Sequence, residues 1–140
     1  MKIYEFEQHF YPFRLMACVG TDAIRGFFEL DCEPLESNCP AMTACRVTKN
    51  TQDNVVLFRF RDVKAIKTIN IVHECGHFGI DVFEYIDQPI CGDSSESFCY
   101  LIGWAGCCCD WLKAHLSGEE EDCNYAGRLV YDTELSADPK

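Results

Sequence analysis

A stretch of mostly apolar residues, 69–86, constrains the fold of this chain more than any other segment. It is too long for a typical strand, and apolar side chains recur on nearly all sides of a helix drawn through it. We therefore expect a helix that starts near Val63 or Lys67, ends near Ile86 and is buried all round. Gly76 and Gly79 are poor helix formers, which suggests that another element packs closely against this backbone.

His73, Glu74 and His77 give this helix the pattern H-E-x-x-H. Residues four apart lie nearly one above the other on a helix, so both imidazoles can bind one metal ion. The glutamate between them is placed to take a proton from a water molecule on that metal. We expect Zn²⁺ here, because burying two imidazoles and a carboxylate without partners is costly. The alternative is that both histidines are ordinary helix residues with local hydrogen bonds.

A second helix is expected from Asp93 or Ser94 to Leu116, and its first turn offers a third zinc ligand. A catalytic zinc ion takes three protein ligands and leaves one position open. Glu96 is the best candidate, because two antiparallel helices joined by a short break bring the start of the second beside the end of the first. The alternative is a capping box in residues 93–96, in which Glu96 closes the helix N-terminus.

Two other side chains belong to the same hypothesis. Asp81 follows His77 by one turn and is either a fallback ligand or a group that orients an imidazole from outside the ligand set. Tyr100 follows Glu96 by one turn, and its phenol could donate to a developing oxyanion or orient Glu96. An aromatic of the core or of a groove is the alternative for Tyr100.

Strand-like patterns dominate the first part of the chain. Alternation and turn residues predict strands at 2–7, 13–19, 43–48, 54–60 and, late in the chain, 126–133, and the third and fourth form a hairpin. Residues 25–31 are ambiguous between strand and a helical turn. Strands followed by helices favour an α+β fold. We expect one domain over residues 1–140, with an antiparallel sheet of four or five strands packed on two main helices.

Within that domain, residues 1–62 would be mainly strands, 63–117 would hold the two helices with the metal site, and 118–140 would form an acidic tail. The net charge of −11 arises entirely in residues 71–140. Nucleic acid is therefore not expected as a partner. A basic or neutral protein is more plausible, and an acidic rim could favour cationic substrates.

Localisation and thiol chemistry follow from the same composition. The longest apolar stretch is too short to cross a membrane, and the acidic N-terminal residues do not resemble a signal peptide. An odd count of eleven cysteines argues against a disulfide framework, so we expect small buried thiols in a reducing compartment.

Four segments carry a family resemblance: HECGH at 73–77, DVFEYI at 81–86, ESFCYLIGW at 96–104 and YPFRL at 11–15. They resemble the small zincin-like proteins encoded by tailed phages of Bacteroides-type hosts, of the Glu-zincin branch of metallopeptidases. The resemblance implies that His73, His77 and Glu96 bind zinc and that Glu74 is the general base. The larger thermolysin-like enzymes carry an aspartate where this chain has Tyr100, and they have a second domain that it lacks.

The sequence therefore predicts a minimal zincin that hydrolyses peptide bonds in a peptide or protein substrate. The rival hypothesis is a non-catalytic component of a phage particle, in which zinc only stabilises the fold and the acidic tail contributes to assembly with other virion proteins. Either hypothesis places the protein in the host bacterial cytoplasm or in the virion. A binding module without metal is a third option.

Overall fold

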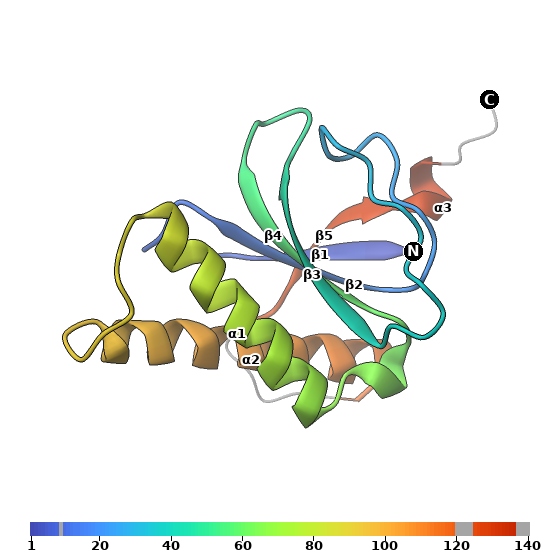
Figure 1. Ribbon diagram of the computed structural model, residues 1–140. Helices are drawn as coiled ribbons and strands as arrows, with labels where there is room; N and C mark the ends of the chain where they lie inside the picture. Colours follow the sequence, from blue (N-terminus) through green and yellow to red (C-terminus); the bar gives the residue numbers. More distant parts are fainter. Residues whose placement is uncertain (9, 120–124, 137–140) are drawn as a thin grey trace.

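The computed structural model describes residues 1–8, 10–119 and 125–136, and it shows the expected α+β fold. One sheet and two long helices make up most of it (Figure 1). The strands are β1 (Lys2–Phe6), β2 (Arg14–Val19), β3 (Ala41–Val47), β4 (Asn54–Phe60) and β5 (Arg128–Asp132). The helices are α1 (Thr68–Tyr85) and α2 (Ser95–Ser117), with a 3₁₀ turn η1 (Val63–Ala65) before α1 and a short helix α3 (Thr133–Ser136) after β5.

The sheet is mixed, so the expectation of a purely antiparallel sheet is wrong. Its strand order is β3-β4-β2-β1-β5, and β2 pairs with β4 in parallel, with Ala17 opposite Phe58. The other three pairs are antiparallel, including the predicted hairpin of β3 and β4. A parallel pair requires a long crossover. Here residues 20–40 and β3 together provide it, and local periodicity does not reveal that route.

The two faces of the sheet are covered differently. Both long helices pack on one face (Figure 1), where Leu15, Val56 and Phe58 meet Phe78 and Leu112 in the larger core. The 20–40 connection covers the other face and buries Ile24, Phe28 and Cys32 there. Residues 25–31 form neither of the predicted alternatives; isolated bridges from Ile24 to Cys32 and from Phe28 to Thr48 hold this segment.

Helix α1 is buried on one side only, so the expectation of burial all round is wrong. Its Cys75, Phe78 and Val82 are almost completely buried. On the outer side, Ile69 is 71% exposed and Val72 is 65% exposed. The physical reason is the two-layer architecture: the sheet and α2 cover one side of α1, and no further layer among the described residues covers the other.

The expected close packing on α1 holds at one of its two glycines. A Cβ atom at Gly79 would lie 2.7 Å from both Ile102 and Phe98 of α2, whereas a Cβ atom at Gly76 would meet nothing within 4 Å. Gly79 therefore sets the spacing between the helices. Gly76 faces open space beside His77.

The predicted late strand is confirmed as β5, which pairs with β1 at the far side of the sheet. Most of the acidic stretch of the predicted tail (120–122) and its last four residues (137–140) lie outside the described residues. Within the described part of the chain, no helix is long and apolar enough to cross a membrane. Of the ten described cysteines, five are buried and four are exposed.

Candidate functional site

The two motif histidines lie on the outer side of α1 and face each other. Both are exposed, and their Nε2 atoms are 3.2 Å apart. The ring planes meet at 72°, with ring centroids 4.8 Å apart. Each histidine is two residues from buried Cys75, which is about 200° around a helix. The pair therefore points away from the core and into solvent.

The spacing of the two Nε2 atoms suits a shared metal ion. Two nitrogens bound to one tetrahedral zinc at about 2.0–2.1 Å are about 3.3 Å apart. The two Nε2 atoms are already almost this far apart, so binding one zinc ion would require little movement of either ring. A hydrogen bond between the two rings, with one imidazole donating to the other, accounts for the same distance in the absence of metal. The donor set therefore fits two of the ligand positions of a zinc site.

Glu74 is turned from the histidines toward the edge of the sheet. Its side chain is only 4% exposed, and its Oε1 accepts a hydrogen bond of 2.7 Å from the Thr43 hydroxyl. Thr43 lies on β3, the last strand on this side of the sheet. The carboxylate therefore sits between α1 and the sheet edge. The sequence does not single out Thr43, because the contact depends on how α1 crosses β3.

Glu96 is not brought together with the histidines. It is exposed in the first turn of α2, two residues before Phe98. Phe98 faces Gly79 of α1, so Glu96 points about 200° away from that contact. The chain reaches α2 only after α1 has continued from His77 to Tyr85, which is about two turns. Within residues 1–8, 10–119 and 125–136, no three His, Cys, Asp or Glu side chains form a group that could hold a metal ion.

The capping alternative for Glu96 is not realised as a capping box either. Ser94 is the N-cap residue of α2, but its side chain makes no capping bond to the helix. Its hydroxyl instead donates to Pro89 O at 2.5 Å and accepts from the Cys91 N–H at 3.0 Å. Ser94 therefore fastens the loop between the helices.

Tyr100 lies in a different part of the surface from the histidines. It is 75% exposed on α2 and lines a hollow of about 620 Å³ with Tyr11, Trp104 and Tyr125. This position agrees with the alternative for Tyr100, an aromatic side chain of a groove. The catalytic role remains a prediction without geometric support.

Asp81 lies one turn beyond His77 and contacts the edge strand. The Cys45 thiol donates to its Oδ2 at 3.6 Å. Partial burial and the charge of Asp81 raise the pKa of the Cys45 thiol to about 11, so this group stays protonated at neutral pH. Strand alternation places Cys45 on the same side of β3 as Thr43. Two side chains of the edge strand thus bind carboxylates of α1.

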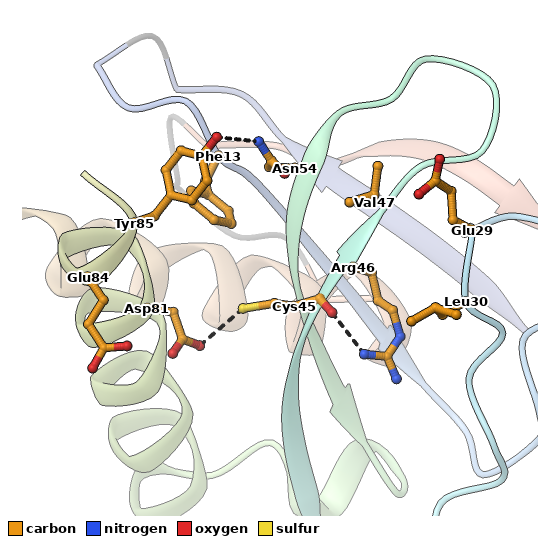
Figure 2. A pocket seen from close by; sticks show the side chains of 10 residues that line it. All are labelled: Phe13, Glu29, Leu30, Cys45, Arg46, Val47, Asn54, Asp81, Glu84 and Tyr85. Atoms are coloured by element: carbon orange, nitrogen blue, oxygen red, sulfur yellow. Dashed lines mark hydrogen bonds between the residues drawn. The ribbon is translucent and has the colours of Figure 1, made fainter. Parts of the chain in front are cut away.

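A cavity of about 470 Å³ opens where α1 passes this strand (Figure 2). Asp81, Glu84 and Tyr85 of α1 stand on one side, and Glu29, Leu30 and Arg46 on the other. Asn54 donates to the Tyr85 hydroxyl at 3.1 Å, and Phe13 packs edge-on against the Tyr85 ring. The sequence does not predict that these residues lie together, because they come from five separate segments of the chain.

No family model, curated protein or solved structure matches this chain. The zincin resemblance therefore rests on the motif and its flanking segments alone.

Proposed function

We propose that the protein is a zinc-dependent peptidase that binds its metal through His73 and His77. The observation that carries the proposal is the pair of exposed Nε2 atoms 3.2 Å apart, with Glu74 between them in sequence and turned toward a sheet edge. Zn²⁺ bound there would supply a Lewis acid that makes water a nucleophile near neutral pH. Two histidines leave the ligand set incomplete, and Glu96 would have to move to complete it.

Glu74 is the residue that we propose to move the proton. Its carboxylate would accept a proton from the attacking water and return it to the leaving amine. The Thr43 hydroxyl would hold the carboxylate through the 2.7 Å hydrogen bond to Oε1. The second oxygen of the carboxylate, Oε2, would take the proton. Thr43 is a positioning residue in this scheme.

The substrate would lie extended beside β3. This strand ends the sheet on one side, and α1, the helix that carries the histidines, packs against it. An edge strand offers backbone N–H and C=O groups that can pair with an extended peptide. A peptide placed there would lie alongside α1, outside the contacts that β3 makes with this helix.

The test compares zinc content and cleavage in three variants. Glu74→Gln should keep one bound zinc per chain but lose cleavage of a mixed peptide library by at least about a hundredfold. His77→Ala should lose both zinc and cleavage. Glu36→Gln, at an exposed position in the 20–40 connection, should change neither. Wild-type cleavage in the Glu74→Gln variant would exclude the proposed base.

A second candidate function is a non-catalytic protein in which zinc only stabilises α1, as in a component of a phage particle. Two observations favour it: the buried Glu74 carboxylate is already engaged by Thr43, and the described residues supply no third ligand. This candidate predicts that zinc raises the melting temperature of the wild type but not of His77→Ala. No peptide in the library would be cut by either protein.

A further inference from the structure

We propose that the cavity between α1 and β3 binds the basic side chain of a peptide, lysine or arginine, about two residues from the motif histidines. The inference rests on the proposed peptidase function, because it names the class of substrate. The cavity of about 470 Å³ is large enough for one long side chain and part of its backbone (Figure 2).

The charges that line the cavity favour a cation. Glu29, Asp81 and Glu84 contribute three carboxylates, and Arg46 contributes one guanidinium. The Arg46 guanidinium is held by a hydrogen bond of 2.8 Å from its Nη1 to Cys45 O. Asp81 accepts a hydrogen bond from the Cys45 thiol, which is a neutral donor and does not cancel its charge. An anionic side chain would face net repulsion here, and a cationic one would be attracted.

An aromatic wall suits the alkyl part of the same side chain. Tyr85 is 56% exposed, and its ring is fixed by Asn54 at the hydroxyl and by Phe13 edge-on, with ring centroids 4.8 Å apart. Lysine and arginine place their methylene stems on such surfaces while the charged end reaches polar groups. The ring face also attracts a cation directly. A purely apolar side chain would contact the Tyr85 ring but not the carboxylates, and a short side chain would not reach both.

The cavity lies at a defined distance from the histidines. Asp81 follows His77 by four residues, which is about 6 Å along the helix axis. An extended peptide advances about 3.3 Å per residue. A substrate that runs beside α1 with its scissile bond at the histidine pair would therefore place a side chain about two residues away in the cavity.

The first experiment measures binding without metal and without cleavage, so that it does not depend on the peptidase proposal. Acetyl-Ala-Ala-Lys-Ala-Ala-amide, and the same peptide with norleucine or glutamate at the centre, are titrated into zinc-free ¹⁵N-labelled protein. The lysine peptide should bind at least about threefold more tightly than the norleucine peptide, and the glutamate peptide most weakly. The amide signals of Cys45, Asp81 and Tyr85 should shift most. Equal affinity for all three peptides would overturn the proposal.

A charge-removal pair tests the named carboxylates. Glu29→Gln with Glu84→Gln should weaken the lysine peptide about three- to tenfold and leave the norleucine peptide unchanged. The matched control, Glu36→Gln with Glu119→Gln, removes the same charge from exposed positions that do not line the cavity. An equal loss in the control would mean that net charge, and not this cavity, attracts the peptide. Asp81 is left intact because it lies close to the histidines.

Two more arms separate the alternatives. Spermidine, a free polyamine with the same alkylammonium chemistry, should bind less tightly than the lysine peptide; tighter binding of spermidine would overturn the assignment to a peptide. With zinc added, cleavage should favour peptides that carry lysine or arginine near the scissile bond. A preference for the lysine peptide in binding, without any cleavage, would support the proposed cavity site and reject the peptidase function. Cleavage without a preference for lysine or arginine would support the peptidase function and reject the cavity site.

Discussion

Arg59 is a charged side chain with no exposed surface, and it holds the loop on the outer face of the sheet. Its Nη2 donates to Asp22 O at 2.6 Å, and its Nη1 donates to Glu33 O at 2.7 Å. Both acceptors belong to the 20–40 connection, which has no regular secondary structure. A single side chain thus satisfies backbone groups that the loop itself leaves unpaired.

Replacing Arg59 by Met should lower the free energy of unfolding by about 2–4 kcal/mol, because the buried carbonyl groups lose their donors. Urea denaturation followed by circular dichroism measures the change. Arg25→Met is the control: Arg25 is 58% exposed and makes only surface ion pairs, so its loss should cost less than about 1 kcal/mol. Equal losses in both variants would show that the buried bonds contribute nothing special.

At the scale of single residues, the sequence located the histidine pair but not its surroundings. Helical spacing alone predicts that His73 and His77 meet, and they do. The position of Glu96 depends on the length of α1 beyond His77 and on the rotation of α2 about its own axis. Neither quantity can be obtained from local spacing. Thr43 was missed for the same reason, since its partner Glu74 is 31 residues away.

Helix α1 shows how two glycines three residues apart have different roles in one element. Gly79 meets α2 at its backbone, whereas Gly76 lies against open space. The difference follows from position around the helix, because Gly79 faces the core side and Gly76 lies toward the exposed flank. The sequence predicted that close packing would occur on this helix but not at which glycine.

Gly79→Ala should destabilise the protein by about 1–3 kcal/mol, because the new methyl group would lie 2.7 Å from side chains of α2. Gly76→Ala is the matched control in the same helix and should raise the free energy of unfolding by up to about 1 kcal/mol through helix propensity. Thermal denaturation of the two variants measures the contrast. A stabilised Gly79→Ala variant would mean that the helices can separate freely.

Among the strands, all five were predictable from alternation, and their boundaries differ from prediction by a few residues at most. The parallel pairing of β2 with β4 was not, because alternation fixes which side chains share a face and not which strand lies next to which. The cover of the outer face by residues 20–40 was also missed, since that segment has no periodic pattern.

The whole molecule carries a net charge of −11, with 23 acidic and 12 basic side chains. Some of these charges are paired. Glu5, only 3% exposed, forms ion pairs with both Arg14 of β2 and Arg128 of β5. In the described part of the chain, the other ion pairs involve Asp31, Glu33, Asp53 and Asp62, and acidic side chains still far outnumber basic ones. Repulsion among them opposes the compact state.

Added salt should therefore stabilise the protein. Raising NaCl from about 0.01 M to about 0.15 M shortens the screening length from about 30 Å to about 8 Å. The melting temperature should rise by about 2–5 °C as a result. The double variant Glu119→Lys with Glu134→Lys changes two exposed positions. Its melting temperature should rise less with salt, because its net charge is less negative. A fall in melting temperature with salt would mean that ion pairs such as those of Glu5 outweigh the repulsion.

The pairing of β1 with β5 has a consequence for how the protein is made. A ribosome releases β1 first and β5 last, yet these two strands lie side by side, and Thr133 N–H bonds to Met1 O at 3.1 Å. During translation, β2 can occupy one edge of β1 while the other edge waits for residues that are not yet synthesised. An open edge invites pairing with a neighbouring nascent chain on the same messenger. Synthesis rate and chaperone access during that interval therefore matter more for this topology than for one whose edge strands are made early.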